Sequence, residues 1–173
     1  LILAQFSGCY AESNWQIGTE NTGPNNLTPG VVFDNLAGTM TLTADGDFRG
    51  VSGNSNPAGI PFDCSFTDGI VKACISIPSD GTVSFDWSYS MQLYFEDPGN
   101  EPFGYCLNGD NFVSVITAGM LSDQSGTVNI PVSAGDELCI VQASYFSEEF
   151  QAVTVVSNFV LPACPPLPLS DCY

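Results

Sequence analysis

Residues 81–91 read GTVSFDWSYSM, and every second side chain from Val83 onward is apolar. Successive side chains of a strand face opposite sides of a sheet, so this alternation predicts a β-strand with one buried and one solvent-facing side. The buried side carries three aromatic residues in succession, Phe85, Trp87 and Tyr89. Because aromatic rings bring the largest apolar area per residue, we expect this strand to be the central strand of one sheet of a β-sandwich.

The rest of the chain repeats this pattern in shorter pieces separated by Gly, Asn and Asp turns. No window has a helical period, and about ten short strands are predicted in all. The other main runs are 31–33, 39–44, 62–66, 70–77, 103–107, 112–117, 127–132, 138–143 and 152–160. We expect 62–66 and 70–77 to form a hairpin, and 103–107 and 112–117 to form a second one. Pro131 points its strand toward a sheet edge, because proline cannot donate a ladder hydrogen bond.

This organisation predicts one all-β domain over residues 1–161, an antiparallel β-sandwich of jelly-roll-like type stapled by disulfides. From Pro162 the composition changes to PACPPLPLSDCY, residues 162–173. A proline-rich stretch cannot join a sheet interior and favours extended polyproline geometry. We therefore expect residues 162–173 to be a linker or a capping tail.

The charge balance excludes two classes of partner. The net charge is −17, from 19 acidic residues against only Arg49 and Lys72. A field of that sign repels nucleic acid and anionic lipid, and no stretch approaches the roughly 20 apolar residues of a membrane span. The same field suits divalent cations, although net charge also serves simply to keep a β protein soluble.

Cysteine usage indicates the compartment. The chain has seven cysteines, no histidine and no CxxC pair, so a zinc site is not expected. Seven cysteines at scattered spacings favour an oxidising environment, and we expect a secreted or cell-surface protein.

The spacings suggest some of the cysteine pairs. Cys64 and Cys74 are placed symmetrically about the turn at 67–69, so they are expected to pair across a hairpin. Cys106 and Cys139 lie on separate predicted strands and could pair within or between sheets. The remaining cysteines lie near the two chain ends: Cys9, Cys164 and Cys172. An odd number leaves one free thiol or a link between molecules.

Five blocks of the sequence together resemble a known kind of module. They are FSGCYAESNWQ (6–16), GTVSFDWSY (81–89), DPGNEPFGYCLNG (97–109), SGTVNIPVSAGDELCIVQAS (125–144) and SNFVLP (157–162). In combination they resemble a β-sandwich module of large secreted and cell-surface bacterial proteins, often adhesin-like and often repeated. The resemblance implies surface structure or adhesion without enzymatic activity. The chain departs from the pattern at Cys9, Cys106 and Cys139, which leaves open whether it is a repeat or a self-standing, disulfide-stapled subunit.

Enzymatic chemistry is hard to build from these residues. Without histidine there is no Ser-His or Cys-His nucleophile pair, and no GxSxG, Walker or Rossmann loop occurs. The remaining route is a carboxylate pair that hydrolyses a glycosidic bond. The candidate acids are Asp86, Glu96, Asp97, Glu101, Glu148 and Glu149. Asp86 lies on the polar side of its strand, where it could project into a groove, although a solvated surface acid is the ordinary interpretation.

A calcium site is a stronger candidate. Hard cations prefer several oxygen ligands from carboxylates, amides and loop carbonyls. Within six residues the chain offers Glu96, Asp97, Asn100 and Glu101. The turns at 45–47 and 108–110 offer two oxygen-bearing side chains each, but turns also select Asp, Asn and Gly for backbone reasons.

Two functions of different classes follow. The first is a non-enzymatic structural or adhesive β-sandwich, a cell-surface adhesin module or a self-assembling filament subunit. The apolar run 1–6 and the tail would then contact neighbouring copies or repeats. The alternative is a calcium-dependent carbohydrate-binding module whose partner is a surface glycan.

Overall fold

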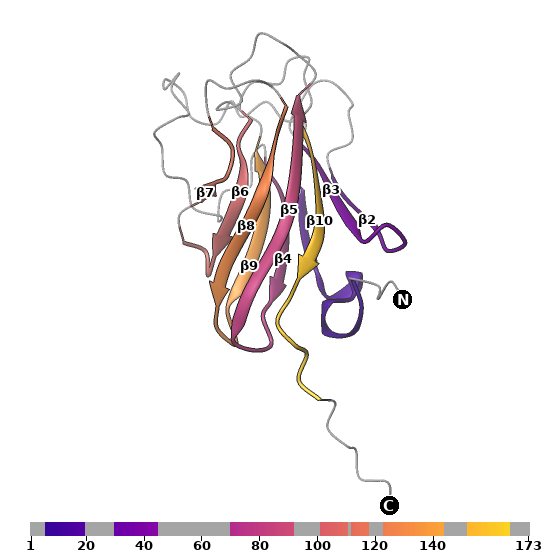
Figure 1. Cartoon of the computed structure of the whole chain (residues 1–173), viewed down its shortest axis with the longest axis vertical. Coiled ribbons are helices and arrows are strands. Elements are labelled where there is room, and N and C mark those ends of the chain that lie inside the picture. The colour runs from indigo at the N-terminus through magenta and orange to yellow at the C-terminus, as the bar shows by residue number, and fades with distance from the viewer. Residues whose placement is uncertain are drawn as a thin grey trace, which may run out of the picture.

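The computed structural model describes residues 6–19, 30–44, 70–91, 101–110, 112–117, 123–143 and 152–166. Within these ranges two five-stranded antiparallel sheets pack face to face (Figure 1). Two disulfides lie within the described residues. The predicted all-β, antiparallel, disulfide-stapled and jelly-roll-like sandwich is confirmed.

The sheet nearer the viewer in Figure 1, the front sheet, has β10 in its middle. Its order is β2 (Gly30–Asp34), β3 (Thr39–Ala44), β10 (Ala152–Val160), β5 (Gly81–Met91) and β8 (Gln124–Val132). The order of the back sheet is β1 (Gln16–Thr19), β4 (Ile70–Ser76), β9 (Glu137–Ala143), β6 (Phe103–Leu107) and β7 (Val113–Ser114). Two short 3-10 turns, η1 (Gly8–Tyr10) and η2 (Glu12–Asn14), precede β1.

From β4 onward the chain passes back and forth between the two sheets. β4, β6, β7 and β9 lie in the back sheet, and β5, β8 and β10 lie in the front sheet. The strand at 81–91 has the predicted bounds and is an inner strand, but the prediction that it is the central one is wrong, because β10 holds that place. Pro131 lies on β8, an edge strand, as expected.

The core lies between the sheets, and β5 contributes its whole apolar side to it. Its inward side chains are all buried: Val83, Phe85, Trp87, Tyr89 and Met91. Trp87 is 7% exposed and packs 6.0 Å from Phe103, measured between ring centroids. Its indole also covers Gly126, the residue opposite it on β8, where a Cβ would lie 3.1 Å from the ring. The glycine therefore lets the indole lie against the edge strand.

A polar contact bridges the two sheets inside this core. The fully buried side chain of Gln142 on β9 accepts a 2.6 Å hydrogen bond from the hydroxyl of Thr154 on β10. The amide of Gln142 donates to the backbone carbonyls of Glu101, Pro102 and Ala143 at 3.0 to 3.3 Å. Both buried side chains are thus satisfied, as low-dielectric surroundings require.

The segment before β1, which belongs to the sequence block at 6–16, contributes aromatic residues to the core. Phe6 is buried and contacts Trp15, Phe33 and Phe159 edge-to-face. The Trp15 indole N–H donates to the carbonyl of Tyr10 at 3.2 Å. Phe6 therefore packs within its own chain, so this end of the run 1–6 is not available to a neighbouring copy. Residues 1–5 lie outside the described residues.

The predicted hairpin of 62–66 with 70–77, the strand that contains β4, is wrong. β4 has β1 on one side and β9 on the other, so it has no free edge to form a hairpin with 62–66. The second predicted hairpin is confirmed, because β6 pairs with β7, although β7 is shortened to Val113–Ser114.

The disulfides differ from those expected. Cys74 bonds to Cys139, which lies directly opposite it on β9, with their Cα atoms 4.0 Å apart. The expected pairs Cys64–Cys74 and Cys106–Cys139 are therefore both wrong. Cys106 is disulfide-bonded as well.

A second disulfide joins the two ends of the described chain. Cys9 bonds to Cys164, 155 residues later. Cys9 and Cys164 are two of the three cysteines near the chain ends, and because they bond to each other they are not available for a link between molecules.

Candidate functional site

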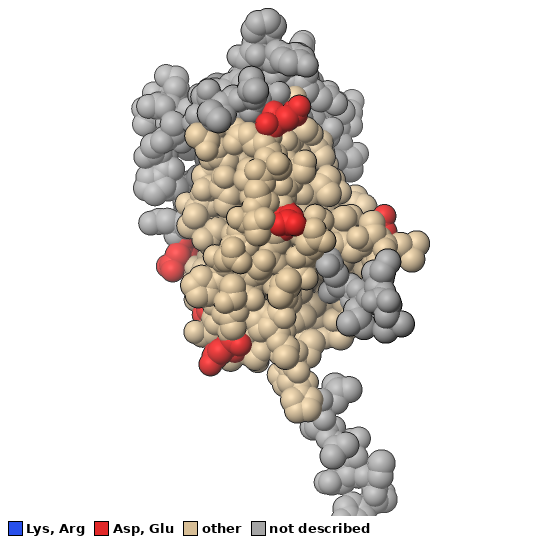
Figure 2. Space-filling model, viewed as in Figure 1, with Lys and Arg blue, Asp and Glu red and all other residues tan. Residues whose placement is uncertain are grey.

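The outward side of the front sheet, here called the front face, is a field of hydroxyl groups. Its hydroxyl-bearing side chains are Thr39, Thr41, Thr43, Thr82, Ser84, Ser88, Ser90, Ser125, Thr127 and Ser157. They are exposed or half-buried because they alternate with the apolar residues that fill the core. Figure 2 shows this side of the molecule as an open surface, largely free of charge, with isolated acidic groups.

Strand register aligns these side chains in rows. One row crosses all five strands, through Val32, Thr41, Val155, Ser88 and Ser125. Neighbouring strands lie about 4.8 Å apart and same-side residues about 6.8 Å apart along a strand. The hydroxyls of β3, and those of β5 and β8, are therefore regularly spaced, while valines of β10 (Val153, Val155 and Val160) lie between these two groups.

Asp86 is the carboxylate of β5 and lies among the hydroxyls of β5 and β8. Its Oδ1 accepts a 2.5 Å hydrogen bond from the hydroxyl of Thr127 on β8. Its Oδ2 accepts a 2.8 Å hydrogen bond from the side-chain amide of Asn158 on β10. Three strands thus hold one carboxylate in a fixed orientation at the surface.

A β-bulge places the Asn158 amide. The register of β10 against β5 shifts between Ser157 and Val160, so successive residues Ser157 and Asn158 both face outward. Asn158 has φ 51°, in the left-handed region that asparagine tolerates better than most residues. The bulge re-aims the side chain toward Asp86.

These hydrogen bonds set the charge of Asp86. The Thr127 hydroxyl, and after it the Asn158 amide, hold the pKa of the Asp86 carboxyl below its usual range, against a small opposing effect of burial. An ionised carboxylate has about four lone-pair sites, of which two are used here. The group is therefore a preorganised acceptor at ordinary pH.

Asp86 does not have the surroundings of a glycosidase acid. A general acid needs a raised pKa and a second carboxylate roughly 5–9.5 Å away. The neighbours of Asp86 on this face are Ser84, Ser88, Thr127 and Ser157, none of which is acidic. Among the other candidate acids, Glu96, Asp97, Glu148 and Glu149 lie outside the described residues, as does Asn100.

Glu101 is the described member of the predicted calcium set, and it is 3% exposed. It lies just before β6, where its backbone carbonyl accepts from Gln142. Glu101 is thus buried beside the back sheet and does not lie on the front face. Calcium binding at 96–101 stays a prediction, since the other three residues lie outside the described ranges.

In the turn at 108–110, the side chain of Asn108 has a structural role. The Asn108 amide donates to Asp136 at 2.8 Å, and the Asn108 side-chain oxygen accepts from the backbone N–H of Glu137 at 2.8 Å. Asp136 also accepts from the backbone N–H of Ser133, and these two hydrogen bonds, the one from Asn108 foremost, lower its pKa. The side chains therefore hold two turns together. The turn at 45–47 lies outside the described residues.

One cluster of potential metal ligands occurs in the described part of the chain, formed by Cys74, Glu137 and Cys139. The two sulfur atoms are bonded to each other, and a metal requires thiolates. The cluster is therefore a disulfide with a nearby carboxylate.

Sequence reasoning found Asp86 and missed its two partners. Thr127 and Asn158 lie 41 and 72 residues away, and strand pairing alone brings them together. An asparagine in the middle of an otherwise β-branched and aromatic run was a usable signal, because such a residue often marks a bulge or a positive φ.

No protein-family model matches the sequence, and no curated protein matches it at a significant level. Solved structures with a similar arrangement include the N-terminal cellulose-binding domain of β-1,4-glucanase C from Cellulomonas fimi, at 12% identity and a TM-score of 0.38, covering 88% of this chain and 91% of that one. A family 35 carbohydrate-binding module from Clostridium thermocellum has 12% identity and a TM-score of 0.33, covering 76% of this chain and 100% of that one.

The K3 cleaved adhesin domain of Lys-gingipain from Porphyromonas gingivalis has 10% identity and a TM-score of 0.34, covering 84% of this chain and 93% of that one. At this level of similarity the comparisons carry no argument about function. The class of the protein, a disulfide-stapled antiparallel β-sandwich, rests on its own strand pairing.

Proposed function

We propose that this protein is an extracellular, non-catalytic adhesive module whose front face binds neutral glycans. The observation that carries the proposal is the Asp86 group, a carboxylate oriented by Thr127 and Asn158 among the hydroxyls of β5 and β8. Sugars present several hydroxyls that both donate and accept hydrogen bonds. A fixed acceptor flanked by an amide and hydroxyls is matched to that pattern.

The charge favours uncharged ligands. The net charge of −17 repels uronic and sulfated chains, and Lys72, the cation among the described residues, lies on β4 in the back sheet. In the part of the chain that the structure describes, every aromatic side chain is buried or half-buried. Binding on these strands would therefore rely on hydrogen bonds and van der Waals contact rather than ring stacking.

The disulfides support the extracellular assignment. The Cys9–Cys164 and Cys74–Cys139 disulfides need an oxidising compartment to persist. The helices among the described residues are single 3-10 turns, too short and too polar to span a membrane.

Affinity electrophoresis of the oxidised protein in gels that contain neutral or acidic polysaccharides tests the proposal. We expect retardation by at least one neutral polysaccharide and none by acidic ones. Asp86→Asn should weaken binding by about tenfold or more, equal to about 1.4 kcal/mol. Asn158→Gly should weaken it too, since glycine keeps the positive φ but removes the amide.

Asp136→Asn is the matched control. Asp136 is also a half-buried aspartate with two hydrogen bonds and a lowered pKa, but it lies in a turn at the end of the sandwich. Its substitution should leave glycan binding unchanged. A loss of binding equal to that of Asp86→Asn, or no retardation by any neutral glycan, contradicts the proposal. Repeating the gels with a chelator tests the calcium-dependent alternative.

A further inference from the structure

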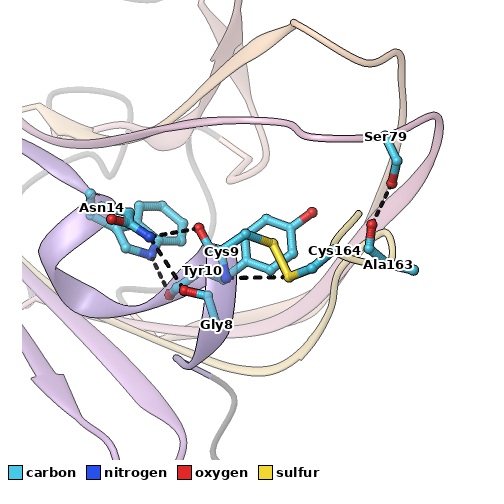
Figure 3. The surroundings of a disulfide bond; sticks show 8 residues. Gly8, Cys9, Tyr10, Asn14, Ser79, Ala163 and Cys164 are labelled. Carbon is cyan, nitrogen blue, oxygen red and sulfur yellow. Dashed lines mark hydrogen bonds between the residues drawn. A yellow bond between two sulfur atoms is a disulfide. The ribbon is translucent and has the colours of Figure 1, made fainter. Parts of the chain in front are cut away.

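The segments before β1 and after β10 lie side by side at one end of the sandwich (Figures 1 and 3). The Cys9–Cys164 disulfide joins them, with Cα atoms 5.8 Å apart across 155 residues of sequence. Every strand from β1 to β10 lies between these two cysteines. The bond therefore closes a covalent loop around the whole sandwich.

Both sides of the bond are held in ordered structure. On the N-terminal side, the Asn14 amide donates to the carbonyls of Gly8 and Cys9 at 3.3 and 3.0 Å (Figure 3). On the C-terminal side, the Ser79 hydroxyl donates to the carbonyl of Ala163 at 2.7 Å. The bond is thus seated against the end of the fold.

The strand order shows what tension would do without this bond. A pull on the two chain ends would act on β1, an edge strand of the back sheet, and on β10, the middle strand of the front sheet. It would strip β10 from β3 and β5 and draw the two sheets apart. Hydrogen-bonded strands yield to forces that leave covalent bonds intact.

We propose that the Cys9–Cys164 disulfide is a tension bypass. A force that arrives before Cys9 and leaves after Cys164 follows the shortest covalent path, which crosses the disulfide and omits every strand. The sandwich and its front face then stay folded while the chain on either side is under load. This role is independent of what the front face binds.

Single-molecule force spectroscopy tests the bypass, with the full chain fused to a handle at each end. The oxidised wild type should transmit force with no unfolding step. The Cys9→Ser/Cys164→Ser variant should show one. Because the Cys74–Cys139 bond still bridges 65 of the 155 residues, 90 remain to extend, roughly 300 Å at about 3.4 Å per residue.

The Cys74→Ser/Cys139→Ser variant is the matched control, because it lacks one disulfide but keeps the bypass. It should show no step. If the Cys9→Ser/Cys164→Ser variant does not fold by circular dichroism, the wild type is pulled before and after a phosphine reductant is added, and a step should appear only afterwards. A step of roughly 300 Å in the oxidised wild type overturns the proposal, as does an equal response before and after reduction.

Discussion

Replacing Trp87 by alanine should be among the most damaging single changes in this protein. Its indole is 7% exposed, packs on Phe103 and covers Gly126. Truncating a buried tryptophan to alanine costs about 3–5 kcal/mol. In a domain of this size 1 kcal/mol shifts the melting temperature by about 2–4 °C, so we expect a loss of about 6–20 °C. Val155→Ala, on the front face of the same sheet, should stay within about 0.5 kcal/mol.

A double-mutant cycle sharpens this test. In the wild type, Gly126→Ala places a Cβ 3.1 Å from the Trp87 indole, and such overpacking costs about 1–3 kcal/mol. In the Trp87→Ala background the ring is gone, and alanine in a strand is about 0.5–1 kcal/mol better than glycine. Gly126→Ala should therefore destabilise the first protein and stabilise the second.

Urea unfolding followed by circular dichroism supplies the four free energies of unfolding. If Trp87→Ala lies within 0.5 kcal/mol of the wild type, or if the effect of Gly126→Ala is the same in both backgrounds, then the indole does not lie where the structure has it.

Three further measurements test other features. Gly104→Ala should lower the free energy of unfolding by about 3 kcal/mol, because a Cβ there would overlap a carbonyl oxygen of β7, and an unchanged urea midpoint would exclude that contact. Hydrogen bonds lower the folded-state pKa of Asp86 and Asp136, so the stability that they contribute is present above the ordinary carboxyl range and is lost as pH falls below about 4. Asp→Asn at both sites should therefore reduce the pH dependence of the urea midpoint across that range. If the loop at 96–101 binds calcium, a saturating concentration should raise the melting temperature, and Asp97→Asn with Glu101→Gln should abolish the shift; a wild type that calcium leaves unchanged has no such site.

The sequence predicts the local part of this fold well because side-chain alternation is a local signal. The strands at 39–44 and 81–91 have the bounds and buried sides that their patterns indicate, and the strand at 152–160 has the predicted bounds, although it buries Thr154 and exposes Val155. Which strands pair is a non-local property. A turn signal before 70–77 predicts a hairpin, but both edges of β4 are taken by strands that are distant in sequence.

The cysteines show the same limit. Cys139 lies in register between Cys74 on one side and Cys106 on the other. Predicting Cys106–Cys139 therefore identifies a true neighbour but the wrong bond, because spacing along the chain does not distinguish two in-register partners. The candidate site shows the same limit. Alternation within one strand predicts that Asp86 lies on the polar side, whereas strand pairing and a bulge bring Thr127 and Asn158 to it, and these are not visible in the local pattern.

The hydrogen bond between Thr154 and Gln142 also fixes how the two layers are aligned. Apolar surfaces that face each other can slide by a residue and still bury much the same area, because the hydrophobic effect is non-directional. Sliding here would separate a buried hydroxyl from a buried amide oxygen, and each unsatisfied group would cost about 1–3 kcal/mol. That penalty is a sizeable part of a typical domain's stability. A Thr154→Val, Gln142→Leu double variant should therefore keep a compact all-β core while admitting more than one stacking of its sheets, visible as doubled or broadened methyl resonances.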